Sequence, residues 1–98
     1  MMTVHWSETA IAHLQGIRDY VARNSPGYAR VFVDRIVRRT ERLADLPLLG
    51  AEVPEYGDVA IREVLEHPYR ILYRVIADQV EVFAVIHGAR PLPRTPPG

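Results

Sequence analysis

Arginines set among apolar residues are the side chains of this sequence that are best placed to bind a ligand or take part in chemistry. The chain has 98 residues, and its 12 basic side chains, all arginine, balance 12 acidic ones. Four arginines lie in or beside segments rich in Val, Ile and Tyr, and these are Arg62, Arg70, Arg74 and Arg90. Burying an arginine without a partner costs on the order of several kcal/mol, so each either pairs with a nearby acid or faces solvent and a ligand. The nearby acids are Glu63, Glu66 and Glu81.

A second group of arginines falls on one side of a predicted helix. Its members are Arg35, Arg38, Arg39 and Arg42, whose helical angles span roughly 100°. Such a cluster can grip an acidic protein segment or phosphate groups. It can equally be a solvated helix face, with Asp34 and Arg38 as an ordinary pair four residues apart. The net charge of zero gives no nucleic-acid signature for the chain as a whole.

Histidine and cysteine usage argues against a metal or a thiol site. The four histidines have no ligand-like spacing, and the absence of cysteine excludes disulfides, zinc–thiolate sites and thiol nucleophiles. No glycine-rich phosphate loop is present, and we expect no cofactor. His87 differs from the other histidines because it closes the last apolar segment, just before Arg90. It could transfer a proton at a phosphate, or simply bond to the backbone at a strand end.

Periodicity predicts the elements that position these side chains. Residues 3–6 form a short β-like run, and Ser7 is a typical N-cap of a helix whose apolar residues recur at helical spacing. Ser25 and Pro26 then end that helix and start a second one, which continues to about residue 45. From Val59 onward the period changes to two, which predicts three strands at 59–66, 69–77 and 79–88 joined by tight hairpins.

These elements predict an α+β fold in which a helical hairpin packs on one face of a small twisted antiparallel sheet. The predicted order is strand, two helices, then three strands. Two helices make one layer and cover one face of the sheet. The other face carries Arg70, Leu72, Arg74 and Ile76 on the central strand. We therefore expect this second face to be partly open and to bind a partner.

The domain organisation follows from length and composition. We expect one domain over residues 1–92 and an extended, proline-rich tail over residues 93–98. No signal peptide and no membrane-length apolar stretch are visible, so we expect a cytoplasmic protein.

The ordered motifs of the sequence resemble those of the RelE/ParE superfamily, the toxins of bacterial type II toxin–antitoxin modules, and the ParE branch above all. The motifs are Trp6-Ser7, Ser25-Pro26, Leu46-Pro47, Val53-Pro54-Glu55, Ile61-Arg62-Glu63, Tyr69-Arg70-Ile71-Leu72-Tyr73-Arg74-Val75 and Val85-Ile86-His87-Gly88-Ala89-Arg90. The resemblance implies a helical hairpin on a twisted antiparallel sheet. It also implies a cognate antitoxin protein whose flexible segment wraps and neutralises the toxin.

The resemblance implies two activities that need different residues. RelE-type members cut messenger RNA on the ribosome, and in this chain Arg62, Arg70, His87 and Arg90 would be their metal-free catalytic group. The lysines and the late tyrosine of that branch are missing here. ParE-type members are proposed to poison DNA gyrase by binding, without chemistry of their own. We expect the gyrase-binding activity, with mRNA cleavage and a non-toxic antitoxin-binding module as alternatives.

The expected binding residues divide between the two partners. His87 and Arg90 are expected to contact the target. The antitoxin is expected to contact two sets, one on the central strand and one on the second helix. These are Arg70, Leu72, Arg74 and Ile76, and Arg35, Arg38, Arg39 and Arg42.

Overall fold

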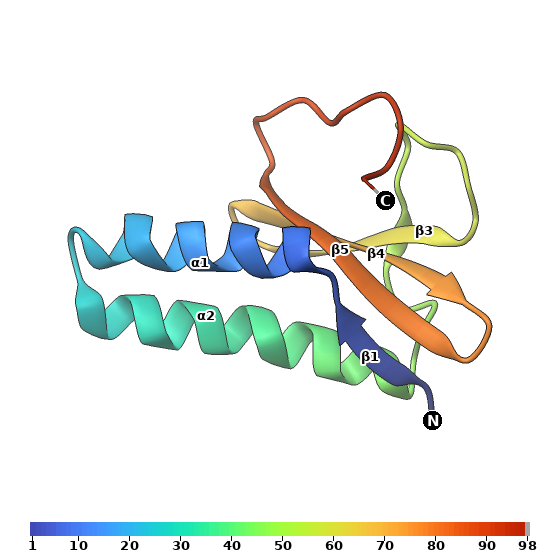
Figure 1. Ribbon diagram of the computed structural model, residues 1–98, viewed down its shortest axis with the longest axis horizontal. Coiled ribbons are helices and arrows are strands. Elements are labelled where there is room, and N and C mark those ends of the chain that lie inside the picture. Colours follow the sequence, from blue (N-terminus) through green and yellow to red (C-terminus); the bar gives the residue numbers. More distant parts are fainter. Residues whose placement is uncertain (98) are drawn as a thin grey trace.

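The computed structural model describes residues 1–97 and confirms the predicted α+β fold (Figure 1). Both predicted helices and all three C-terminal strands are present, with ends within a few residues of those predicted. The elements are β1 (Thr3–Trp6), α1 (Glu8–Ala22), α2 (Pro26–Glu41), a 3-10 turn (Arg42–Ala44), β2 (Ala51–Glu52), β3 (Ile61–Glu66), β4 (Tyr69–Ile76) and β5 (Gln79–His87).

Serine caps start both helices, as the sequence predicts. The Ser7 hydroxyl accepts a hydrogen bond from the Ala10 N–H at 3.1 Å, and the Ser25 hydroxyl accepts one from the Tyr28 N–H at 3.2 Å. Pro26 occupies the first turn of α2, where its missing N–H costs nothing. The two helices lie side by side against one face of the sheet (Figure 1).

The sheet is mixed, which corrects the expectation of a purely antiparallel one. Its strand order is β1-β5-β4-β3-β2, and β1 runs parallel to β5 while the other neighbours are antiparallel. The helices and the strands β2–β4 all lie between these two strands in the sequence, which gives the long connection that a parallel pair requires. A bulge between Leu72 and Tyr73 leaves Phe83 as an extra residue of β5. Phe83 and Ala84 therefore both lie on the face away from the helices.

Both faces of the sheet carry a buried core, so the second face is less open than expected. The helix-side core contains Ile36, Ile71 and Tyr73, all fully buried. On the outer face a second core contains Val53, Ile61, Leu72, Phe83 and Ala84.

Two segments without regular structure cover that outer face. They are the loop between β2 and β3, which contributes Val53 and Tyr56, and the C-terminal chain, which contributes Leu92. In Figure 1 the C-terminal chain (red) leaves the end of β5, arches, and returns toward the sheet. Of the second-face residues expected to be exposed, Ile76 is about half exposed, whereas Leu72 is fully buried. Leu72 therefore offers no surface to a partner in this state.

Gly50 lies in close contact with the β3 backbone and with Tyr73. Its N–H donates to the Tyr73 hydroxyl at 3.0 Å, and that hydroxyl donates to the Pro47 carbonyl at 2.8 Å. A Cβ at position 50 would lie 2.4 Å from the Glu63 carbonyl oxygen. Only glycine fits there, and this contact fixes the loop that leads into β2.

We predict that Gly50→Ala destabilises the protein while Gly16→Ala stabilises it. The added methyl at position 50 must push the β3 backbone away, at a cost of about 1–3 kcal/mol. Position 16 lies inside α1 with nothing within 4 Å of the new methyl, so alanine should gain about 0.5–1 kcal/mol of helix stability. Urea unfolding of the two variants measures both changes, and an equal effect of both would contradict this account of Gly50.

Candidate functional site

Arg70 is held by two carboxylates on the outer face of the sheet. Its guanidinium donates to the Glu55 carboxylate at 2.7 and 2.9 Å and to the Glu63 carboxylate at 2.6 and 3.2 Å. Only 14% of the Arg70 side chain is exposed. The hydrogen bonds from Arg70 hold the pKa of Glu55 at about 2, and the two carboxylates raise the pKa of Arg70. This arginine joins the β2–β3 loop to the sheet.

Arg62 and Arg74 also make contacts within the chain. Arg62 donates to the carbonyl oxygens of Val59 at 2.9 Å and Gly50 at 3.0 Å. Arg74 Nε lies 3.1 Å from a Glu81 carboxylate oxygen, in an orientation that makes an ion pair without a hydrogen bond. The Arg74 guanidinium also stacks 4.5 Å from the centre of the Phe83 ring.

Pairing within the protein is therefore the correct alternative for Arg70 and Arg74. Glu63 and Glu81 are partners that the sequence predicts, whereas Glu55 was not foreseen. Arg62 is satisfied by backbone carbonyls instead of an acid.

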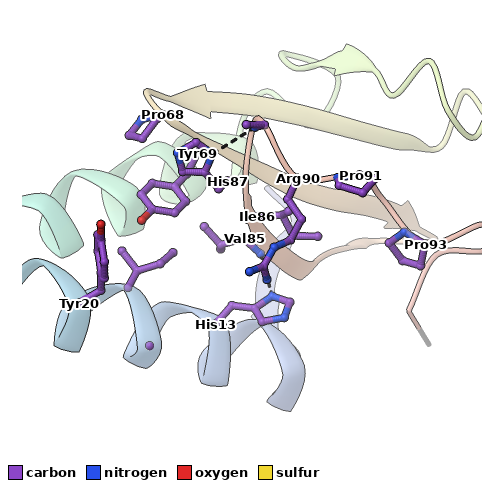
Figure 2. Close-up of a pocket in the computed structure, with 13 residues that line it drawn as sticks. His13, Tyr20, Pro68, Tyr69, Val85, Ile86, His87, Arg90, Pro91 and Pro93 are labelled. Carbon is purple, nitrogen blue, oxygen red and sulfur yellow. Dashed lines mark hydrogen bonds between the residues drawn. The ribbon is translucent and has the colours of Figure 1, made fainter.

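A groove of about 990 Å³ lies between α1 and the end of β5 (Figure 2). Its residues combine aromatic rings, imidazoles and one guanidinium, and include His13, Tyr20, Tyr69, His87 and Arg90. The Tyr69 and His87 rings meet edge to face with centroids 5.5 Å apart. The Arg90 side chain points toward His13 in Figure 2. This groove therefore combines groups that can stack, donate hydrogen bonds and carry positive charge.

His13 connects α1 to the part of β5 that continues beyond the pairing with β1. Its Nδ1 accepts a hydrogen bond from the Val85 N–H at 3.1 Å, which requires that nitrogen to be unprotonated. Partial burial lowers the pKa of His13, and the positive charge of Arg90 lowers it further. Among the histidines, the sequence singled out only His87. The signal that could have found His13 is its helical spacing with Gly16 and Tyr20, which places all three on one side of α1.

The four residues of the ribonuclease alternative do not share one groove. Arg90 and His87 line the groove beside α1, whereas Arg70 and His87 line a smaller groove of about 530 Å³ together with Glu63. Arg62 lines neither groove. His87 Nδ1 accepts a hydrogen bond from the Ala89 N–H at 3.1 Å. A hydrogen bond to the backbone is the role that the sequence offered as the alternative to proton transfer.

The arginines of α2 remain largely at the surface. Arg39 pairs with Glu66 at 3.1 Å, which joins α2 to β3. Arg35, Arg38 and Arg42 are exposed, and within residues 1–97 no ion pair links Asp34 to Arg38. These three arginines form a free basic strip along the helix.

Two kinds of feature are absent from residues 1–97. No group of three or more His, Asp or Glu side chains is placed to hold a metal ion. Neither helix is long and apolar enough to cross a membrane.

We predict that acid weakens the fold through Glu55. Its pKa falls from 4.5 to about 2 in the folded state, so its bond to Arg70 stabilises the protein above pH 4.5 and is lost as the pH falls toward 2. In Glu55→Gln, the free energy of unfolding should start lower at neutral pH and decline less between pH 5 and 2. Denaturant unfolding at several pH values measures this. The exposed Glu41→Gln is the control and should keep the wild-type profile, and an unchanged profile in Glu55→Gln would contradict the assignment.

Comparisons with known proteins identify the family. A family model described as the ParE toxin of the type II toxin–antitoxin system parDE matches residues 4–92. Toxin RelE2 of Caulobacter vibrioides is 33% identical over 91 residues, which cover 92% of this chain and 99% of that toxin.

Solved structures agree with this assignment. The chromosomal ParDE system from P. aeruginosa has a chain with a TM-score of 0.74 and 28% identity, covering 89% of this chain and 96% of that one. A chain of the RelBE2 toxin–antitoxin complex from Mycobacterium tuberculosis shares the fold, with a TM-score of 0.62 and 20% identity over 88% of this chain and 96% of that one. The chain therefore belongs to the ParE toxin family, within the RelE/ParE superfamily of type II toxin–antitoxin toxins.

Proposed function

We propose that this toxin acts by binding a target protein, DNA gyrase, without cutting RNA, and that a cognate antitoxin neutralises it. The observation that carries the proposal is the double pairing of Arg70 with Glu55 and Glu63. Arg70 would be a phosphate-binding residue of a RelE-like ribonuclease, and in this chain its guanidinium is already occupied.

Electrostatics disfavour a phosphate beside Arg70. Two carboxylates and one guanidinium carry a net negative charge, and at close range they repel a scissile phosphate. To stabilise that phosphate, the arginine would first have to leave both acids, although catalysis depends on donors that are already free and oriented. The separation of Arg70 and Arg90 into two grooves adds a second obstacle.

The groove beside α1 offers the surface that a protein target would need. It brings Tyr20, Tyr69 and His87 together with Arg90. Tyrosine and arginine are enriched among the residues that dominate protein–protein binding energy. His87 and Arg90 were expected to contact the target, and their place in this groove supports that role.

The antitoxin contacts need revision because of the covered face. Leu72 is buried, and Arg70 and Arg74 are engaged within the chain, so none of them is free to meet an antitoxin in this state. The exposed strip of Arg35, Arg38 and Arg42 remains available to an acidic antitoxin segment. Arg39 is available only in part because it holds Glu66, and Ile76 is about half exposed.

We predict growth arrest with induction of the SOS response when the chain is expressed without an antitoxin. Gyrase trapped on cleaved DNA causes that response, so gyrase–DNA cleavage complexes should accumulate. Arrest of translation with cut messages would instead favour the ribonuclease alternative and contradict the proposal. Normal growth at confirmed soluble expression would identify a non-toxic binding module.

We predict that Arg90→Ala weakens gyrase inhibition by about 10-fold or more, as expected for a contact worth about 1–3 kcal/mol. The matched control is Arg30→Ala, which removes an exposed arginine on α2 outside the groove. The concentration of purified protein that halves supercoiling measures both variants. Equal potency of Arg90→Ala and Arg30→Ala would remove this groove from the proposal.

A further inference from the structure

The groove beside α1 contains a positive charge that no acid neutralises (Figure 2). Among its described lining residues Arg90 is the one permanently charged side chain, and none is Asp or Glu. No ion pair within residues 1–97 involves Arg90, whereas Arg39, Arg70 and Arg74 each pair with a carboxylate. Partial burial and, after it, the positive charge of Arg90 lower the pKa of His13. The groove therefore favours a ligand that brings a negative charge.

The imidazoles of the groove are arranged as hydrogen-bond donors. His13 Nδ1 accepts from the Val85 N–H and His87 Nδ1 accepts from the Ala89 N–H, both at 3.1 Å. A neutral imidazole whose Nδ1 is an acceptor carries its hydrogen on Nε2, so the second nitrogen of each ring is a donor. A ligand that matches these groups must supply acceptor atoms as well as a negative charge. A carboxylate supplies both, and it pairs well with a guanidinium such as that of Arg90.

Gly16 leaves open space on the side of α1 that lines the groove. It lies one helical turn from both His13 and Tyr20. Nothing lies within 4 Å of a Cβ added at this position, and its backbone does not have the positive φ that would require glycine. A glycine inside a helix also lowers its stability relative to alanine. Neither packing nor backbone conformation accounts for this glycine in the isolated chain, but its missing side chain allows a ligand to approach the helix closely.

Flat rings flank the charged part of the groove. Tyr20 is 62% exposed on α1, and the Tyr69 and His87 rings meet with centroids 5.5 Å apart. Ile17 belongs to the helix-side core and Tyr69 packs against that core, so this wall is well supported and lies on the helix side of the sheet. An aromatic or apolar side chain next to the ligand's carboxylate would pack against these rings.

A single arginine among rings fits an acidic protein segment better than a nucleic acid. Nucleic-acid binding depends on several basic side chains that neutralise successive phosphates. The groove supplies one guanidinium, and the net charge of the whole chain is zero. A protein segment needs only one carboxylate at Arg90 and apolar neighbours that bury the rings.

We propose that the groove beside α1 binds a short segment of a partner protein in which an acidic residue is flanked by aromatic or apolar residues. The carboxylate of that residue pairs with Arg90, and a flanking side chain lies against α1 in the space left by Gly16. The identification of this partner as the target of the toxin rests on the proposed function. The chemistry of the groove is argued independently of it, from the charge, the donors and the open space.

The first experiment measures peptide binding to the full chain. The probes are a capped Phe-Glu-Phe tripeptide and its neutral counterpart Phe-Gln-Phe, followed by the amide chemical shifts of Ile17 and Val85. The acidic peptide should bind at least about 10-fold more tightly than the neutral one, as expected for a hydrogen bond between charged groups. Arg90→Gln should remove this preference because it removes the positive charge.

The matched variants are Gly16→Leu and Gly27→Leu. Both positions have nothing within 4 Å of an added Cβ, but only Gly16 lines the groove. Gly16→Leu should weaken binding of the acidic peptide at least about 10-fold because its side chain fills the ligand's space, while Gly27→Leu should bind as wild type does. Urea unfolding should show Gly16→Leu to be at least as stable as the wild type, since leucine favours a helix more than glycine does.

Three results would overturn the proposal. The first is equal binding of the acidic and neutral peptides. The second is a folded Gly16→Leu protein that binds the acidic peptide as tightly as Gly27→Leu does. The third is tighter binding of a dinucleotide than of the acidic peptide, which would identify a phosphate site.

Inhibition of gyrase supercoiling links the groove to the target. Gly16→Leu should need at least about 10-fold more protein than Gly27→Leu for the same inhibition, and equal potency would separate the groove from gyrase binding. A wild-type chain without any effect on gyrase would contradict the proposed function alone, because the peptide experiment would still decide whether the groove binds an acidic segment.

Discussion

The pairing of Arg70 with Glu55 and Glu63 is the interaction on which the rest of the structure depends. It joins the β2–β3 loop to the central strands and so brings Val53 and Tyr56 over the outer face. Without it, Leu72 and Phe83 would lie under a loosely attached cover. The same pairing occupies the guanidinium that an RNA-cleaving relative would need. One contact thus links the closure of the fold to the absence of a free phosphate site at Arg70.

The molecule consequently presents different surfaces on its different sides. The groove beside α1 brings aromatic and basic side chains together at the end of β5, where His13 accepts a hydrogen bond from the Val85 N–H. The strip of arginines on α2 is a separate basic surface. The outer face is apolar and already covered by the C-terminal chain and the β2–β3 loop. This separation suits the proposed function, in which the toxin binds both a target and an antitoxin.

Local patterns in the sequence were sufficient for most of the fold. Helical and strand periods located the elements, and Ser7 and Ser25 marked the helix starts. Pairing between distant segments was harder to predict. The parallel partner of β1 is β5, the last strand of the chain, and no local pattern links the two. The outer face is covered by segments that contain prolines and glycines and show neither helical nor strand periodicity. Nothing in the sequence therefore marked Tyr56 and Leu92 as core residues. For Arg70 the sequence left pairing and ligand binding open, and only the loop carrying Glu55 decides between them.

The most direct test of a binding toxin is to assay the purified chain in parallel for inhibition of gyrase supercoiling and for cleavage of messenger RNA on ribosomes. This account predicts inhibition of supercoiling and intact messages at the same protein concentration. Cleaved messages with unaffected gyrase would contradict it, because a working ribonuclease could not keep Arg70 bound to two carboxylates.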